Sequence, residues 1–298
     1  MKIFITGATG FLGFHIVNIA ASQGNKVICL RRKTSISLFD KIAEDKIEWL
    51  NNDNYDWKQK LVDFAPEVLI HCAWSGVRGL DRDGAAIQKS NIDFSQEIFE
   101  AYPYKQIISL GSQAEYGYYA NIVTEEHQLM PLNNYGIAKV KVSENLKTYA
   151  ESNNIEWQWI RIFTVFGEKQ KAGLIYGFTQ KCLNGDKTFE TTLGLQRYSY
   201  MYSFDFARAI MLVVGQKGKS GEYNLSQNSE VYSNIDILET IKIYLHSNID
   251  IKYGVMPYAS NQVMFMDANT TKFINAFGDI PCSDFKSALT RTIDSYKQ

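Results

Sequence analysis

Residues 6–13 decide the fold, and they read Thr6-Gly7-Ala8-Thr9-Gly10-Phe11-Leu12-Gly13. An apolar run over residues 2–6 precedes them and has the length of a buried strand. Residues 11–23 follow with apolar side chains at helical spacing. Glycines between a strand and a helix let the backbone approach a pyrophosphate, whose charge then lies at the helix N-terminus. The spacing is GxxGxxG rather than GxGxxG, and in this context it predicts a dinucleotide-binding loop.

The alternation of strand and helix continues along the first half of the chain. Further apolar runs occupy residues 26–30, 47–50, 67–72, 106–110 and 155–163, and the long helical patterns occupy 81–102 and 133–153. Short buried strands separated by helices predict an α/β fold with a Rossmann-type, doubly wound parallel sheet.

The regular alternation of strands and helices ends after about residue 167. Short strand patterns at 187–190, 196–202 and 222–225 mix with helical patterns at 174–184, 205–215 and 233–247. We therefore expect a cofactor-binding Rossmann domain over 1–166. A smaller α/β domain over 167–298 should mainly bind the substrate, with some segments returning to the first domain. Only 5 prolines occur, without a Gly/Ser-rich linker, so we expect a tight interface between the two parts.

Composition and charge exclude several classes of protein. The 298 residues are 45% hydrophobic and 21% charged, which excludes a wholly disordered chain. A net charge of -1 provides no field that would attract nucleic acid or an anionic membrane. Four scattered cysteines form no CxxC pair, so neither a metal site nor a disulfide framework is expected. No apolar run reaches the length of a membrane span, and we expect a cytoplasmic protein.

The end of the second strand indicates which dinucleotide is bound. It reads Leu30-Arg31-Arg32-Lys33, where an NAD-binding protein usually carries an acidic residue for the ribose 2′-hydroxyl. Arginine instead pairs well with a 2′-phosphate. A solvated run of charge is the alternative interpretation. The run favours NADP(H) over NAD(H).

Tyr135 and Lys139 form the candidate pair for proton transfer. They lie four residues apart and therefore share one face of the predicted helix 133–153. An ammonium group there is expected to lower the pKa of the phenol and prepare it for acid–base chemistry. A Tyr and a Lys four residues apart would also be expected by chance in a chain with this many of both residues, so the pair alone does not identify a site. Ser112 gives it a context, because Ser112 follows the strand 106–110 at the sheet edge where ligands of such folds bind.

These motifs resemble the extended short-chain dehydrogenase/reductase family, which is also called the NAD-dependent epimerase/dehydratase family. That family shows TGxxGxxG, a Ser or Thr four residues before Tyr-Gly, and YxxxK, matched here by residues 6–13, by Ser112 with Tyr116, and by Tyr135 with Lys139. Other segments resemble further family motifs: residues 71–73, Asn91, 161–167, 194–197 with 201–207, and 222–225. The resemblance covers nearly the whole chain.

The resemblance implies a role for each matching residue. The catalytic set would be Ser112, Tyr135 and Lys139. The cofactor-binding residues would be Gly7, Thr9, Gly10, Phe11, Leu12, Gly13, Arg31, Arg32, Asn52, Cys72, Ala73, Trp74, Asn91, Tyr135, Lys139 and Phe163. The residues binding a nucleotide-diphosphate sugar would be Trp74, Ser112, Gln113, Thr164 and Arg197, with Arg197 meeting the phosphates. Members pair through two helices per subunit, which implies a homodimer through 81–102 and 133–153.

Departures from the family pattern narrow the reaction. The 4,6-dehydratases carry an Asp-Glu pair directly after the Ser or Thr, where this chain has Gln113 and Ala114. Glu115 lies one position further along the chain than the second residue of that pair. Successive side chains of an extended segment face opposite ways, so we expect Glu115 to face away from the site of the pair. No cysteine lies in this loop, as it does in epimerases that act at C3 and C5. These differences leave C4 epimerisation or reduction of a 4-keto group.

An NADPH-dependent 4-ketoreductase of a dTDP- or CDP-linked 6-deoxysugar, of the kind used for surface polysaccharides such as O-antigen, is the expected activity. Two alternatives stay open: a C4 epimerase with tightly bound NAD, and a non-catalytic NADPH-binding regulator. The family's second phosphate-binding arginine is missing around residues 256–261. Arg78 and Arg82, after the fourth strand, either line the sugar pocket or are surface arginines.

Overall fold

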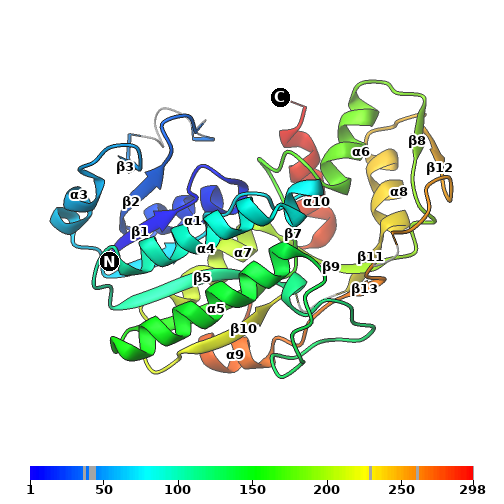
Figure 1. The fold of residues 1–298 in the computed structure, drawn as a ribbon. Helices are drawn as coiled ribbons and strands as arrows, with labels where there is room; N and C mark the ends of the chain where they lie inside the picture. Colours follow the sequence, from blue (N-terminus) through cyan, green and yellow to red (C-terminus); the bar gives the residue numbers. More distant parts are fainter. Residues whose placement is uncertain (36–37, 40–44, 228–229, 260–261, 298) are drawn as a thin grey trace.

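The computed structural model describes residues 1–298 except 36–37, 40–44, 228–229, 260–261 and 298. A seven-stranded sheet, parallel at every pairing, forms the central layer (Figure 1). In spatial order the strands are β10 (Gly221–Leu225), β6 (Glu156–Ile162), β5 (Gln106–Ser112), β4 (Val68–His71), β1 (Lys2–Thr6), β2 (Lys26–Arg31) and β3 (Glu48–Asn51). The predicted Rossmann-type parallel sheet is confirmed.

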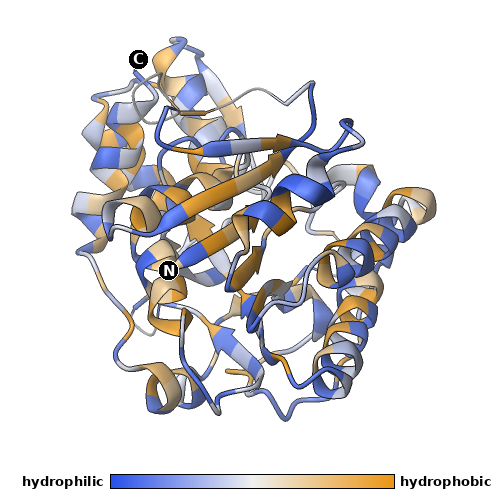
Figure 2. Cartoon of the chain, turned by 90° about the vertical axis from the view of Figure 1, so that its left-hand side faces the viewer, coloured by the Kyte–Doolittle hydropathy of each residue, from blue (hydrophilic) through white to orange (hydrophobic). Residues whose placement is uncertain are grey.

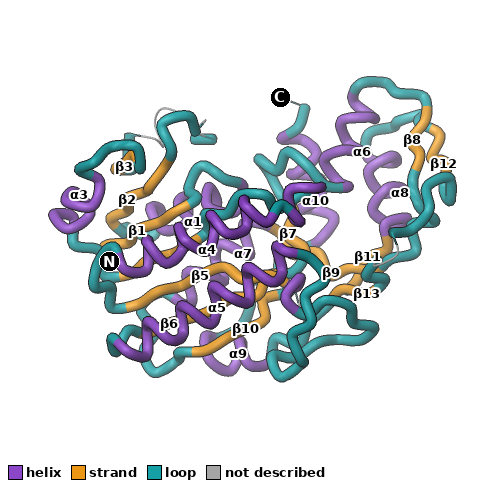
Figure 3. The backbone as a smooth tube through the Cα atoms, viewed as in Figure 1, coloured by secondary structure: helices purple, strands orange, loops and turns teal. Residues whose placement is uncertain are grey.

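Helices cover both faces of this sheet. On one face lie α1 (Phe11–Ser22) and α7 (Ser203–Val213), with α9 (Thr271–Phe277) beside β10. On the other face α4 (Ala85–Glu100) and α5 (Asn134–Ser152) run side by side (Figure 3), and α3 (Trp57–Phe64) packs near β3.

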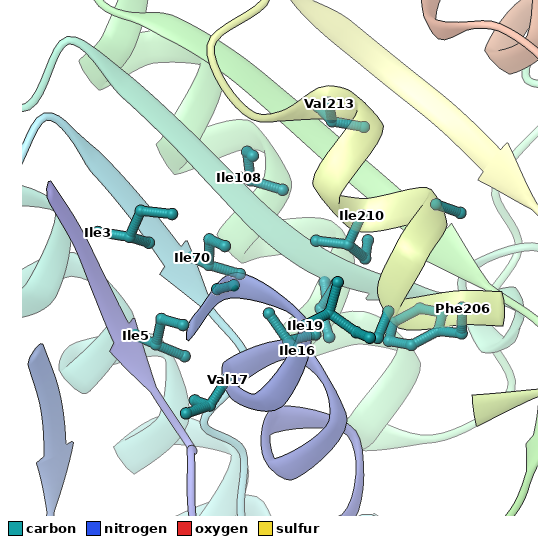
Figure 4. Close-up of a cluster of buried hydrophobic side chains, with 14 of the residues drawn as sticks. Ile3, Ile5, Ile16, Val17, Ile19, Ile70, Ile108, Phe206, Ile210 and Val213 are labelled. Carbon is teal, nitrogen blue, oxygen red and sulfur yellow. The ribbon is translucent and has the colours of Figure 1, made fainter. Parts of the chain in front are cut away.

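Apolar side chains on both faces of the strands hold these layers together. Ile3 and Ile5 belong to the cluster that includes α1 and α7 (Figure 4), whereas Phe4 belongs to the cluster under α4 and α5. A strand buried on both faces reads as a continuous apolar run, which is why the central strands are strongly hydrophobic (Figure 2).

The second half of the chain adds smaller sheets beside the carboxyl edge of the large one. β9 (Arg197–Tyr202) pairs with β7 (Thr164–Phe166), β11 (Val231–Ser233) and β13 (Phe265–Met266), and β8 (Thr188–Glu190) pairs with β12 (Asp250–Lys252). The helices α6 (Leu174–Leu183), α8 (Asn234–Tyr244) and α10 (Phe285–Ser295) contribute to a third apolar cluster. β10 and α7, from the same half of the sequence, complete the large sheet and one of its faces.

The structure corrects the helix predicted over residues 81–102. A 3₁₀ helix, η1 (Gly79–Asp83), comes first, and α4 begins only at Ala85. Gly84 is extended between them, with ψ of 95°. Gln88 Nε2 donates to the carbonyls of Gly76 and Asp81 at 2.9 and 3.1 Å, so a side chain holds this turn in place of helical hydrogen bonds. Apolar spacing does not detect such a break.

The short strands β7, β11 and β13 have no counterpart in the sequence prediction, because strands of two or three residues show no period. The sequence prediction also missed the helices α9 and α10. Along the described ranges, no helix is both long and apolar enough to cross a membrane.

Candidate active site and cofactor cavity

The loop between β1 and α1 packs tightly against the end of β4. Gly7 has a φ of +72°, and a Cβ atom on it would lie 2.6 Å from the backbone nitrogen of Ala73. A Cβ on Gly13 would clash with the carbonyl of Gly7. Gly10, the N-cap of α1, supplies no side-chain acceptor for the first turn. The loop therefore needs its glycines, and it leaves the N-terminus of α1 suited to an anion.

A cavity of about 330 Å³ opens beside this loop at the carboxyl edge of the sheet. Most of the predicted cofactor residues line it: Gly7, Thr9, Gly10, Arg31, Arg32, Asn52, Cys72, Ala73, Trp74 and Asn91. The sequence prediction missed other lining residues: Thr6, Leu30, Ser35, Ser75, Ser90 and Phe94. Four of these, Thr6, Leu30, Ser75 and Ser90, are each next to a predicted residue in the sequence, which is the signal that could have found them.

The remaining predicted cofactor residues lie outside the lining of this cavity. Gly13 packs on Gly7, and Leu12 packs against the apolar cluster of α1 and α7. Phe11 contacts the ring of His15 edge to face, with centroids 5.6 Å apart. Phe163 is buried in a separate cluster with Tyr116. Tyr135 and Lys139 lie next to the cavity, in contact with its Trp74 wall.

The end of the cavity formed by β2 and β3 carries two arginines and a buried amide oxygen. The Arg31 guanidinium carbon lies 4.6 Å from the centroid of the Trp49 ring, and its Nε donates to Asn51 Oδ1 at 3.3 Å. Arg32 is exposed at the rim. Asn52 Oδ1 is buried and has no hydrogen-bond partner among the residues that the structure describes, so it can accept from an amine of a base. These residues fit a dinucleotide.

Amide side chains of α4 fix the loop that follows β4. Asn91 Nδ2 donates to the carbonyl of Ser75 at 2.8 Å, and the Ser75 backbone N–H donates to Asn91 Oδ1 at 2.9 Å. Gln88 Oε1 accepts from Trp74 Nε1 at 3.0 Å. Asn91 thus shapes the cavity wall that carries Trp74.

Ser112, Tyr135 and Lys139 come together where β5 ends and α5 begins, and all three are buried. Burial raises the pKa of Tyr135, and a hydrogen bond with the Ser112 side chain acts in the opposite direction. Lys139 Nζ donates to the carbonyl of Leu110 at 2.6 Å and lies 3.5 Å from the centroid of the Trp74 ring. Burial lowers the pKa of Lys139 to about 7.

This geometry corrects the expectation that Lys139 lowers the pKa of Tyr135. The pKa of the phenol is raised, chiefly because it is buried. Lys139 Nζ is 5.9 Å from the centroid of the Tyr135 ring and is directed toward Leu110 and Trp74. The cation that opposes this increase in the pKa of Tyr135 is Arg82, whose guanidinium carbon lies 4.7 Å from the ring centroid.

Glu115 also differs from the sequence expectation. The segment after β5 is not extended, contrary to the expectation from the sequence, but forms a 3₁₀ helix, η2 (Gln113–Glu115). In this conformation the Glu115 side chain points into the protein and is fully buried. Its carboxylate accepts from the Ser112 backbone N–H at 2.7 Å, from Trp159 Nε1 at 3.0 Å and from Arg161 Nε at 2.7 Å. Burial alone would lower the pKa of Arg161, but the pairing with Glu115 outweighs it and the pKa is raised. Glu115 is therefore structural here.

A second cavity, of about 340 Å³, is lined by Arg82, which contacts the Tyr135 ring. It brings together Gln113 from η2, Arg82 from η1, and Tyr198 from β9. Among the described residues, those that line it are Gly79, Arg82, Asp83, Gln113, Ala114, Gly117, Leu132, Asn133, Tyr198, Ala259, Gln262, Val263 and Met266. Thr164 donates to Met266 Sδ at 3.3 Å and so borders this wall.

Arg197 is not brought to either cavity. It is exposed and donates to the carbonyl of Val231 at 3.3 Å. Adjacent residues of a strand face opposite ways, so Tyr198 rather than Arg197 reaches the second cavity. The two-residue period of β9 is the signal that could have identified Tyr198. Trp74 lines the first cavity and not the second.

The Rossmann sheet with its glycine loop and carboxyl-edge cavity defines a protein of the pyridine-nucleotide-binding class. Residues 3–226 match the family described as NAD dependent epimerase/dehydratase, and the chain belongs to this family.

Characterised relatives in the family differ in the reactions that their names state. The chain is 25% identical over 283 residues to CDP-abequose synthase from Salmonella muenchen, covering 93% of this chain and 92% of that protein. It is 24% identical over 306 residues to UDP-glucose 4-epimerase from Lactobacillus helveticus, covering 93% and 91%. The structure of UDP-glucuronic acid 4-epimerase from Bacillus cereus, solved with UDP-glucuronic acid and NAD, superposes with a TM-score of 0.85 at 20% identity, covering 100% and 99%.

Removal of the Glu115 carboxylate should strongly destabilise the protein. Glu115→Ala leaves the buried Arg161 unpaired and is expected to lower the free energy of unfolding by about 3–5 kcal/mol, measured by urea denaturation. Asp93→Ala is the matched control, because it removes a carboxylate from the exposed pair with Lys89 and should cost less than about 1 kcal/mol. Equal losses in the two variants would contradict a structural role for Glu115.

Proposed function

We propose that the protein is an NADPH-dependent ketoreductase that reduces the 4-keto group of a nucleotide-linked 6-deoxysugar. The contacts of Tyr135 with one wall residue of each cavity are the observation that carries the proposal. Its ring meets Trp74, a wall of the first cavity, edge to face with centroids 6.0 Å apart, and Arg82, a wall of the second, lies over the ring. A cofactor in one cavity and a sugar in the other would both reach this phenol.

The cofactor supplies the hydride when it is bound. Tyr135 would donate its proton to the C4 oxygen of the sugar as that oxygen gains negative charge. Ser112 would hydrogen-bond the same oxygen and hold it in place. Lys139 would hold the nicotinamide ribose, as the family resemblance implies. Residues 1–166 would bind the cofactor and residues 167–298 mainly the sugar nucleotide, although Gln113 and Arg82 of the first part also line the second cavity.

Reduction is favoured over epimerisation by the two arginines at the cofactor cavity. NADPH is the usual external hydride donor, and Arg31 and Arg32 offer charge-assisted hydrogen bonds to its 2′-phosphate. A CDP- or dTDP-linked sugar is favoured, and the name of the CDP-abequose synthase relative supports CDP. C4 epimerisation with tightly held NAD is the second candidate, which the names of the epimerase relatives and the NAD in the Bacillus cereus structure support.

Tyr135→Phe should abolish turnover without disturbing the fold, because it keeps the ring and removes only the proton donor. We expect kcat for a 4-keto sugar nucleotide to fall on the order of 10²- to 10⁴-fold. NADPH affinity and the free energy of unfolding should stay near their wild-type values. Kinetics at saturating NADPH measure the loss, and Ser112→Ala should lose less.

Tyr149→Phe is the matched control for this experiment. Tyr149 lies on the same helix and is part of the cluster under α4 and α5, so its variant should keep wild-type turnover. If the wild-type protein reduces 4-keto sugars and Tyr135→Phe retains half of that activity, the assignment of the proton donor is wrong. If wild type inverts C4 without consuming NADPH, the epimerase is the correct function.

NADPH should bind more tightly than NADH. Arg31→Asp is expected to weaken NADPH binding by about tenfold to a hundredfold, the size of one charge-assisted hydrogen bond, and to reverse the preference. Lys33→Asp is the control, since Lys33 belongs to the same basic run but does not line the cavity. Titration calorimetry of wild type and both variants with each cofactor measures the six dissociation constants. Equal or tighter NADH binding by wild type would contradict the cofactor proposal.

The protein should be a homodimer that pairs through α4, α5 and the neighbouring η1. Ile137 on α5 is 52% exposed and Leu80 on η1 is 95% exposed, so both would gain from burial. Light scattering should give twice the 34.0 kDa of one chain, and Ile137→Glu with Leu80→Glu should give monomers. Ile243→Glu, at an exposed position on α8, should leave the dimer intact. Wild type that remains at 34.0 kDa at micromolar concentrations would exclude this dimer.

A further inference from the structure

The 3₁₀ helix η1 is fixed over the N-terminus of α5. Asp83 Oδ1 accepts from the backbone N–H of Asn134 at 3.1 Å, and the Asp83 carbonyl accepts from Asn134 Nδ2 at 2.8 Å. On its other side, the Gln88 amide holds the carbonyl of Asp81. These contacts anchor both neighbours of Arg82, so its position beside the start of α5 is built into the fold.

The Arg82 side chain lies over the face of the Tyr135 ring. Its guanidinium carbon is 4.7 Å from the ring centroid, within the range of a cation–π contact. Arg82 also lines the second cavity. Among the residues that the structure describes, no carboxylate forms an ion pair with Arg82, and its buried Nε has no hydrogen-bond partner. Within the described part of the chain, the charge of Arg82 is therefore not neutralised by an ion pair.

Charged groups face Tyr135 from three elements. Arg82 on η1 lowers the pKa of the phenol, and Glu115 on η2 raises it, although burial has the largest effect. Lys139, on the same helix as Tyr135, is farther from the ring and is hydrogen-bonded to Leu110. The other close neighbours are neutral, namely the Ser112 hydroxyl and the Trp74 ring. Arg82 is the cation nearest to the ring of Tyr135 in these contacts.

We propose that Arg82 is a positioning residue that acts through Tyr135, by stabilising the phenolate that forms when the proton leaves. This inference rests on the proposed function. In the reduction, the O–H bond of Tyr135 breaks and its proton bonds to the C4 oxygen of the sugar. The electron pair stays on the phenol oxygen, and the hydride added at C4 comes from NADPH. In the reverse oxidation the phenolate takes the proton back, so a cation beside it favours the reactive form.

A titration of Tyr135 tests this proposal without any turnover. Tyrosine labelled with ¹³C at Cζ is incorporated, and the Tyr135 signal is identified by its absence from Tyr135→Phe. With NADP⁺ bound, Arg82→Met should titrate about one pH unit above wild type, because it loses a nearby positive charge. Arg82→Lys should restore most of the shift. Arg78→Met is the matched control, since Arg78 is exposed in the same loop and lines neither cavity.

The pH profile of the reverse reaction supplies a second test. Oxidation of the 4-hydroxy sugar nucleotide by NADP⁺ needs deprotonated Tyr135, so kcat rises with pH up to the pKa of the phenol. Arg82→Met should move this rise about one unit upward, which lowers kcat about tenfold at a fixed pH on the slope. Raising the pH by the same amount should restore the wild-type value.

The outcomes separate the inference from the function on which it rests. An unchanged Tyr135 titration in Arg82→Met would overturn the role of Arg82, as would a kcat reduced by the same factor at every pH. If wild type oxidises and reduces no sugar nucleotide, the proposed function fails, and the titration of Tyr135 still decides whether Arg82 sets its pKa.

Discussion

The buried carboxylate of Glu115 is the constraint on which the site depends. It joins the ends of two adjacent central strands, because it accepts hydrogen bonds from Ser112 at the end of β5 and from Trp159 and Arg161 on β6. A parallel sheet by itself leaves its carboxyl edge open, and loops there can take many conformations. Glu115 removes that freedom at one point, so Ser112 is held by a charged interaction deep in the protein. Removing either partner would leave a buried charge unpaired.

Two cavities open beside the same edge. The glycine loop of β1 and the end of β4 approach so closely that only Gly7 fits there, and this contact shapes the first cavity. Amide side chains of α4, Gln88 and Asn91, hold the loop that carries Trp74. η1 then brings Arg82 to the second cavity. Tyr135 touches a wall of each, which is the arrangement that a reaction between two bound molecules requires.

The sequence predicts the large sheet well because its signals are local. Continuous apolar strands, helical spacing and a glycine loop each depend on a few neighbouring residues, and the cofactor cavity follows from them. The sequence prediction is wrong where the backbone conformation depends on a side chain that is not adjacent in the sequence. Gln88 breaks the helix predicted over 81–102, and the buried pairing with Arg161 turns Glu115 inward. Likewise, Lys139 donates to the carbonyl of Leu110 because α5 packs against β5, and the spacing of residues in the sequence does not predict this contact.

Transfer of a hydride from NADPH to the sugar is the central claim, and isotopic labelling tests it most directly. The protein is incubated with NADPH carrying deuterium in both positions at C4 of the nicotinamide, and with dTDP- or CDP-linked 4-keto-6-deoxy sugars. Mass spectrometry and NMR of the product should show one deuterium, at C4 of the sugar, with one NADPH consumed for each sugar reduced. A sugar nucleotide inverted at C4 without deuterium and without loss of NADPH would contradict the account and establish an epimerase.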